Sequence, residues 1–131
     1  MGIKENLEII NTKIEKACER SCRKASDITL LGVSKQVEAG RVKEAIDCGH
    51  KSFGENYVQE FVSKYEELSD YKDLDWHFIG HLQKNKVKYI IDKVGLIHSV
   101  DKTSLAGEID KRAERLGTTM PILIEVNLGG E

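Results

Sequence analysis

The feature that most constrains the fold is an alternation between short apolar runs and longer segments with helical periodicity. The first apolar run lacks the polar–apolar alternation of a half-exposed strand, which is typical of parallel strands covered on both faces. Five such runs occur, at residues 28–33, 51–54, 76–79, 95–98 and 121–126. Strands that alternate with helices predict an α/β fold with a parallel sheet and right-handed crossovers.

The segments between the runs carry apolar residues at spacings of three and four, as amphipathic helices do. One such helix, over residues 3–24, precedes the first strand. The helices after the strands are predicted from four apolar sets: Val42, Ala45 and Ile46; Val58, Phe61, Val62, Tyr65 and Leu68; Val87, Ile90, Ile91 and Val94; and Leu105, Ile109, Ala113 and Leu116. Gly49 and Gly117 stand where glycines commonly end helices.

Two parallel architectures compete, an open doubly wound sheet and a (β/α)8 barrel. The glycine-rich turn of a dinucleotide-binding fold is missing after the first strand. Polar residues stand at or near the strand ends instead, where the functional groups of barrels gather; they are Lys35, Asn56, His81, Ser99 and Asn127. We therefore favour barrel-type organisation, with the open sheet as the alternative.

A closed barrel needs eight strands and about 250 residues, whereas this chain of 131 residues supplies five strands. We expect residues 1–131 to form a single domain, the N-terminal portion of a barrel, with about five β/α units after an N-terminal helix. The two outer strands would have unpaired edges. Such edges tend to recruit other chains, so a homo-oligomer is one expected partner state.

Composition excludes several classes of partner. The net charge is −2, from 20 basic and 22 acidic residues, which supplies no general field for nucleic acid or for a membrane surface. The alternating Lys84, Lys86 and Lys88 predict a solvated face. No apolar stretch is long enough for a membrane span and no secretory signal is present, so a cytoplasmic location is expected. The three cysteines predict reduced thiols.

Lys35 is the most specific candidate for chemistry, because it follows a predicted buried strand directly. Apolar surroundings disfavour a charged amine, and a neutral amine attacks aldehydes to form an imine. Position alone, however, favours a lysine that simply reaches solvent. Asn56 could equally cap the helix that follows it. His77 and His81 are about 13 Å apart if extended, so His77 reads as a packed strand residue and His81 as a possible ligand-lining one.

Four segments together resemble the pyridoxal phosphate homeostasis family, also known as the YggS/PROSC family. They are Leu31-Gly32-Val33-Ser34-Lys35, the run from Phe53 to Glu60 (FGENYVQE), the run from Trp76 to Lys86 (WHFIGHLQKNK), and Glu125-Val126-Asn127-Leu128. They occur in the family's order and spacing. The resemblance covers the chain from residue 3 onward.

This resemblance implies a partial TIM barrel of the fold-type III proteins that bind pyridoxal 5′-phosphate (PLP), similar to the N-terminal domain of alanine racemase. It implies PLP held as a Schiff base on Lys35, with Asn56 and His81 near the cofactor. It also implies a role in PLP supply and buffering, without established catalysis, and PLP-dependent apo-enzymes as recipients.

The chain departs from the family's pattern in two ways. Gln36-Val37-Glu38 follows Lys35, where the family often has a further lysine, so any lysine-to-lysine transfer of the cofactor is in doubt. The family's C-terminal half, which should hold the PLP phosphate, has no counterpart here. We therefore expect this chain to bind PLP weakly or not at all. Alternatives are a racemase-like enzyme of the same fold type and a non-catalytic fragment that associates with itself.

Overall fold

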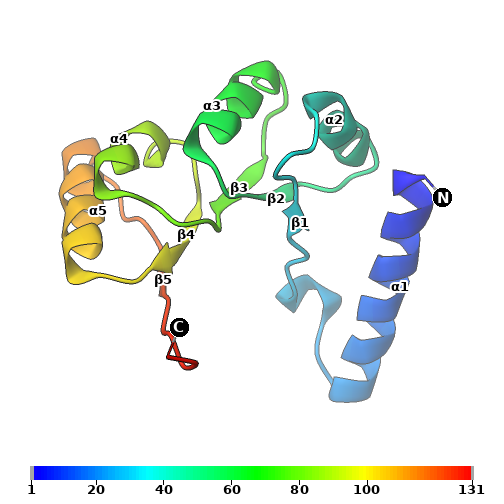
Figure 1. The fold of residues 1–131 in the computed structure, drawn as a ribbon. Coiled ribbons are helices and arrows are strands. Elements are labelled where there is room, and N and C mark those ends of the chain that lie inside the picture. The colour runs from blue at the N-terminus through cyan, green and yellow to red at the C-terminus, as the bar shows by residue number, and fades with distance from the viewer. Residues whose placement is uncertain (1, 131) are drawn as a thin grey trace.

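The computed structural model describes residues 2–130, which form five parallel strands alternating with helices (Figure 1). A long helix precedes the first strand and two short 3-10 turns lie at Ala25–Asp27 and Lys84–Lys86. In chain order the elements are α1 (Ile3–Ser21), β1 (Gly32–Val33), α2 (Ala39–Asp47), β2 (Ser52–Glu55), α3 (Val58–Glu67), β3 (Asp75–Phe78), α4 (Val87–Ile90), β4 (Leu96–Val100), α5 (Thr103–Leu116) and β5 (Ile122–Ile124).

The strand order decides between the two predicted architectures. The strands pair in the order β1-β2-β3-β4-β5, all parallel. A doubly wound sheet reverses its order at a switch point, and no reversal occurs among the described strands. Right-handed crossovers in an unreversed order place the connecting helices on one side of the sheet, and Figure 1 shows α2 to α5 fanned around that outer side. The prediction of barrel-type β/α organisation is confirmed.

The hydrophobic core lies between the sheet and these outer helices. Phe61 of α3, Phe78 of β3 and Ile97 of β4 are 0% exposed. Trp76 packs between Phe53 and Phe61, with ring centroids 5.5 and 5.4 Å apart. Trp76 and Phe78 stand at alternate positions of β3 and so point to the same face of the sheet, the one that the helices cover.

The opposite, inner face of the sheet is open, and here two predictions were wrong. The run 28–33 was expected to be one strand buried on both faces, but strand β1 covers only Gly32 and Val33, and Val33 is 51% exposed. The run 121–126 was expected to be a strand over its whole length, but strand β5 covers only Ile122–Ile124, and Ile124 is 75% exposed. Both runs lie at an edge with one neighbour, so neither their second side nor their inner face is covered by the described residues.

Two helices end where a single residue adopts a left-handed backbone conformation. The first helix was predicted to residue 24 but ends at Ser21, because Cys22 adopts a left-handed conformation (φ 57°) and its N–H bonds back to the Cys18 carbonyl. Gly117 ends α5 in the same conformation, as predicted. The fourth predicted helix is shorter than its pattern, since α4 proper covers only Val87–Ile90.

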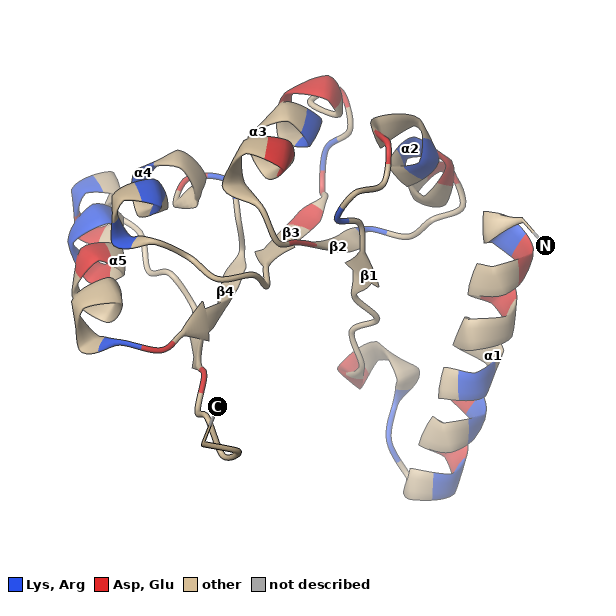
Figure 2. Ribbon diagram, viewed as in Figure 1, with Lys and Arg blue, Asp and Glu red and all other residues tan. Residues whose placement is uncertain are grey.

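The surface of the outer helices is charged with both signs. Figure 2 shows lysines and arginines interspersed with acidic residues along α1 and α5. Lys84, Lys86 and Lys88 are exposed, as the solvated-face interpretation predicted. The cysteines at 18, 22 and 48 are all free thiols. None of the helices within residues 2–130 is both long enough and apolar enough to span a bilayer.

Candidate functional site

Three predicted site residues follow three neighbouring strands. Lys35 lies two residues after β1, Asn56 directly after β2, and His81 three residues after β3. These strands are adjacent and parallel, so their carboxyl ends meet at one edge of the sheet. Val33 pairs with Gly54. The register ends there, and Lys35 lies in the turn that follows β1, at the same edge of the sheet as Asn56.

Lys35 itself is exposed. The apolar surroundings expected of an imine-forming lysine are therefore not found among the described residues, which instead agree with the solvent-reaching alternative. The reason is the open inner face, because Val33, at the end of β1 two residues earlier, is also half exposed. The exposure of Lys35 leaves it accessible to a ligand.

Asn56 and His81 line one cavity of about 850 Å³ between the carboxyl ends of β2 and β3 and the helices α3 and α4. Tyr57 and Tyr89, both about half exposed, contribute aromatic walls. The Oδ1 atom of Asn56 is buried and has no hydrogen-bond partner among residues 2–130. A buried acceptor without a partner is costly and is usually satisfied by a ligand or water. Among the groups at the carboxyl edge of the sheet, this atom is therefore the best candidate for a hydrogen bond to a polar cofactor. Lys35 does not line this cavity.

Close backbone packing fixes the position of Asn56. A Cβ atom placed on Gly80 would lie 2.3 Å from the Asn56 carbonyl oxygen, far closer than any side chain allows. The glycine therefore lets the loop after β3 press against the loop after β2. The Ile79 N–H also donates to the Glu55 carbonyl, at 2.9 Å. These contacts make Asn56 part of a rigid edge.

A buried ionic network lies beside Lys35, and sequence reasoning missed it. Lys64 Nζ of α3 lies 2.9 Å from Glu55 Oε1 and 2.8 Å from Glu60 Oε1. Ser34 Oγ donates to Glu55 Oε2 at 2.9 Å. Lys64 also donates to the Ser34 carbonyl, and the Gln36 N–H donates to Glu60. The one sequence signal for this network is the i,i+4 spacing of Glu60 and Lys64.

The pKa values of the two carboxyl groups in the network shift in opposite directions. Burial raises the pKa of the Glu55 carboxyl above its ordinary value, and the contacts with Lys64 and Ser34 offset only part of this effect. Partial burial opposes ionisation of Glu60 too, but Lys64 and the Gln36 N–H outweigh it and lower the pKa of Glu60. The difference follows from exposure, since the Glu55 side chain is 1% exposed and that of Glu60 is 26% exposed.

His77 belongs to a separate hydrogen-bond chain on the inner face. It is buried in β3, as the packed-residue interpretation predicted, with Nε2 2.8 Å from Asp75 Oδ2 and Nδ1 2.9 Å from His98 Nε2. Partial burial, and then the charge of His77, lower the pKa of His98. No group of three His, Cys, Asp or Glu side chains within residues 2–130 is arranged to hold a metal ion.

Two other strand-end candidates do not join this edge. Ser99 was expected near the end of the fourth strand but lies inside β4, where its Oγ is buried without a hydrogen-bond partner in the described part of the chain. Asn127 lies beyond β5 and is exposed. Its side chain accepts a hydrogen bond from the Gly129 N–H at 3.1 Å, so it closes a turn rather than capping a helix within the described residues.

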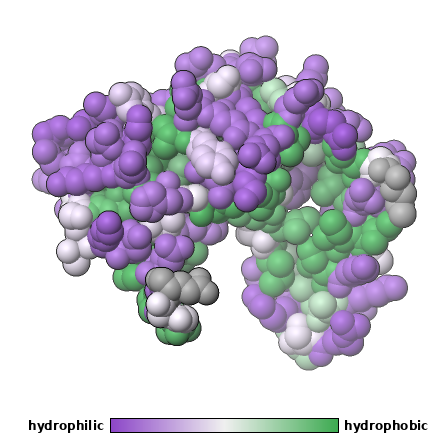
Figure 3. Space-filling model, in the orientation of Figure 1, coloured by the Kyte–Doolittle hydropathy of each residue, from purple (hydrophilic) through white to green (hydrophobic). Residues whose placement is uncertain are grey.

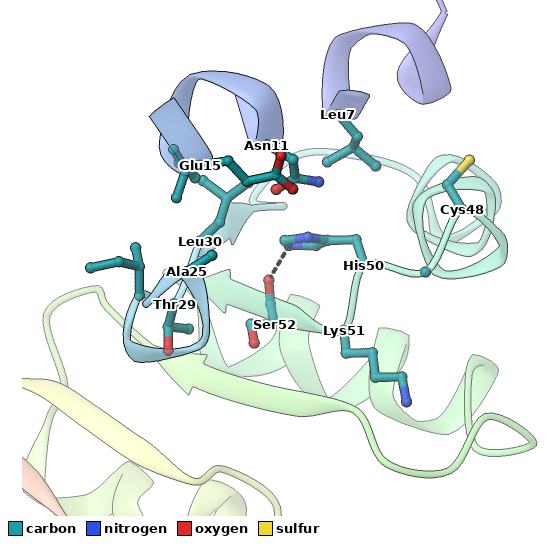
Figure 4. A pocket seen from close by; sticks show the side chains of 13 residues that line it. Leu7, Asn11, Glu15, Ala25, Thr29, Leu30, Cys48, His50, Lys51 and Ser52 are labelled. Carbon is teal, nitrogen blue, oxygen red and sulfur yellow. Dashed lines mark hydrogen bonds between the residues drawn. The ribbon is translucent and has the colours of Figure 1, made fainter. Parts of the chain in front are cut away.

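A second cavity, of about 400 Å³, lies at the opposite, amino end of β2 (Figure 4). Leu7 and Asn11 of α1 face His50 and Ser52 across it. His50 Nε2 lies 2.7 Å from the Ser52 carbonyl oxygen, so this ring nitrogen already has a hydrogen-bond partner. None of the predicted site residues lines this cavity, so it carries no part of the candidate site.

The chain is similar along its whole length to curated relatives. It is 52% identical over 131 residues to the pyridoxal phosphate homeostasis protein of Aquifex aeolicus and covers 57% of that protein. It is 37% identical to the pyridoxal phosphate homeostasis protein of Escherichia coli K12, over 98% of this chain and 56% of that protein. The chain thus spans little more than half the length of the relatives it matches. No protein-family model matches it.

Solved structures agree with this similarity. PipY of Synechococcus elongatus PCC7942, solved with PLP bound, superposes with a TM-score of 0.80 at 37% identity, over 98% of this chain and 56% of that one. A protein of unknown function from Bifidobacterium adolescentis superposes with a TM-score of 0.85 at 33% identity, over 98% of this chain and 56% of that one. In each case the matched part is about half of the solved chain.

Proposed function

We propose that this chain carries the lysine-bearing side of a PLP site. The premise is that the chain belongs to the pyridoxal phosphate homeostasis family and matches the N-terminal part of its members. Lys35 is the proposed attachment residue, and Asn56 and His81 are the proposed neighbours of the cofactor. The observation that carries the proposal is their common place at the carboxyl edge of β1, β2 and β3, where the Asn56 Oδ1 atom is buried without a partner.

PLP supplies an aldehyde with which primary amines condense. The Lys35 amine, exposed at the strand edge, attacks the aldehyde carbon, and a carbon–nitrogen double bond forms with loss of one water. Asn56 can donate or accept a hydrogen bond toward the ligand, because its side chain carries both functions. His81 is exposed in the same cavity and contributes a second polar contact.

We also propose that this chain alone holds PLP weakly. In barrels of this kind phosphate sites lie after strands seven and eight, beyond the five strands described here. Hydrogen bonds to charged groups contribute about 1.5–3 kcal/mol each. Loss of two such bonds weakens binding by roughly 100- to 10,000-fold.

The physiological role we propose is PLP storage and supply in the cytoplasm to PLP-dependent apo-enzymes, rather than catalysis. The free thiols of the three cysteines support a reducing location. Residues 1–131 are proposed to act as one domain, the N-terminal portion of an eight-stranded barrel. A racemase-like enzyme remains the alternative of the same fold type, and loss of an amino acid's optical rotation with protein and PLP would favour it.

Titration with PLP, followed by visible absorption of the lysine-linked cofactor, tests the proposal. We expect a signal that saturates only at PLP concentrations roughly 100- to 10,000-fold above those required by a full-length relative. Lys35→Ala should abolish it. The control Lys51→Ala, at the opposite end of the sheet and also exposed, should leave it unchanged. A signal that survives Lys35→Ala would refute Lys35 as the attachment residue, and saturation at the relative's concentrations would refute weak binding.

One observation favours a second candidate function, self-association. An apolar groove of about 780 Å³ runs between α1 and the exposed edge of β1, lined by Leu7, Ile10, Leu31 and Val33 among others. Figure 3 shows apolar side chains gathered on the side of α1 that faces the sheet. Exposed apolar surface beside an unpaired strand is typical of interfaces. Light scattering that reports a strict monomer at high concentration would count against this function.

A further inference from the structure

The buried ionic network beside Lys35 is made of groups that are expensive to bury. Glu55 is 0% exposed and Lys64 is 5% exposed, and they form an ion pair at 2.9 Å. Taking both charges out of water costs about as much as their attraction returns, and replacing such pairs by apolar residues is often neutral or stabilising. Stability alone therefore does not explain why this pair stands in the core of the chain.

The network forms hydrogen bonds to the residues on both sides of Lys35. On one side, the Ser34 carbonyl accepts a hydrogen bond from Lys64 Nζ, and the Ser34 hydroxyl donates one to Glu55 Oε2. On the other side, the Gln36 N–H donates to Glu60, whose carboxylate is itself held by Lys64 at 2.8 Å. Both neighbours of Lys35 in the sequence are thus tied to the same ammonium group, directly or through one carboxylate.

The backbone held in this way has a conformation that requires support. Gln36 has a φ of 60°, a left-handed conformation that is uncommon for residues other than glycine. The Val37 N–H closes the turn on the Ser34 carbonyl at 3.1 Å, and the Ser34 N–H bonds to the Gly54 carbonyl at 3.0 Å. Such conformations persist where contacts with the surrounding structure hold them in place, and they are concentrated at functional sites.

We infer that Lys64 and Glu55 are positioning residues for Lys35: they fix the Ser34–Gln36 turn so that the Lys35 amine is presented at the carboxyl edge of the sheet. This inference rests on the proposed function, because it concerns the reactivity of Lys35 toward PLP. Lys64 is buried and held by two carboxylates, so its own amine is not offered to the aldehyde. A misplaced reacting group costs roughly 10- to 100-fold in rate.

The double variant Lys64→Met/Glu55→Gln separates positioning from stability, because it leaves no unpaired buried charge. The rate of PLP attachment to Lys35 is measured by visible absorption under excess PLP, and the attachment residue is confirmed by borohydride reduction and peptide mapping. We expect a free energy of unfolding close to that of the unmodified chain but an attachment rate reduced roughly 10- to 100-fold. Ser34→Ala should slow attachment as well, and Ser34→Thr, which keeps the hydroxyl, should restore it.

Two controls make the test specific. Arg112→Met removes another i,i+4 ion pair, between Arg112 and Glu108 on α5. Ile109→Ala opens a cavity at a core position that is 3% exposed, far along the chain from Lys35. Neither should slow attachment to Lys35 in the folded protein, even though Ile109→Ala lowers stability. A double variant that reacts at the unmodified rate would overturn the positioning role while leaving the proposed function intact. Absence of any Lys35-dependent attachment in the unmodified chain would overturn the proposed function and this inference with it.

Discussion

Replacing Lys64 by methionine should destabilise the chain strongly, because it removes the cation from a site that keeps its anion. The Glu55 side chain is 1% exposed and that of Lys64 is 6% exposed, so water cannot replace the lost ion pair. Breaking a buried pair by removing one partner costs about 3–5 kcal/mol. Against a typical total of about 5–15 kcal/mol for a domain, this is a large fraction.

The double variant Lys64→Met/Glu55→Gln should recover most of this loss, because the uncompensated carboxylate is then gone while Ser34 keeps an acceptor. Urea unfolding can follow Trp76, the one tryptophan of the chain, which is 3% exposed between Phe53 and Phe61. Its fluorescence should shift on exposure to water. The more exposed pair on α5 provides the comparison, since Arg112→Met should cost about 1 kcal/mol or less.

Two results would refute this reasoning. The first is a change of less than about 1 kcal/mol for Lys64→Met, which would mean that the pair is solvated like a surface ion pair. The second is a double variant no more stable than the single one, which would mean that Lys64 contributes through packing or its hydrogen bond to Ser34 rather than through the charge of Glu55.

Three further predictions concern the core, the edge and the inner face. Phe61→Ala should lower the free energy of unfolding by about 3–5 kcal/mol in urea titrations, because the ring is 0% exposed. Gly80→Ala should destabilise by about 1–3 kcal/mol through its clash with Asn56, whereas Gly107→Ala, on α5 with open space around its Cβ position, should stabilise by about 0.5–1 kcal/mol. Stability should fall as pH drops below about 6.5, since the lowered pKa of His98 means that the unfolded chain binds the proton more readily. His98→Gln should flatten that dependence in unfolding curves recorded between about pH 7 and pH 5.5.

The sequence predicted the order of elements well because most of the helices and strands carry their own periodic pattern. The helix Val58–Glu67 and the stop at Gly117 follow from apolar spacing and glycine conformation, which are local properties. The runs 28–33 and 121–126 were overpredicted because strand length depends on neighbours. Each has a partner on one side only, and apolar composition says nothing about how many partners a strand has.

The candidate site was predicted in part for the same reason. Lys35, Asn56 and His81 could be placed at one edge because parallel strands end together. The network of Ser34, Glu55 and Lys64 could not be predicted, because it joins residues 21 and 30 positions apart through side chains that read individually as surface residues. The exposure of Lys35 agrees with the solvent-reaching lysine that its position alone favoured, whereas the apolar surroundings expected for an imine-forming amine are not found among the described residues.

The proposal that PLP is held on Lys35 is tested most directly by trapping the attached cofactor. The purified chain is incubated with PLP, reduced with borohydride, digested, and analysed by mass spectrometry of the peptides. We predict that the modified peptide containing Lys35 exceeds every other lysine peptide and disappears in Lys35→Ala. Modification spread evenly over exposed lysines such as Lys51, with no preference for Lys35, would contradict the account.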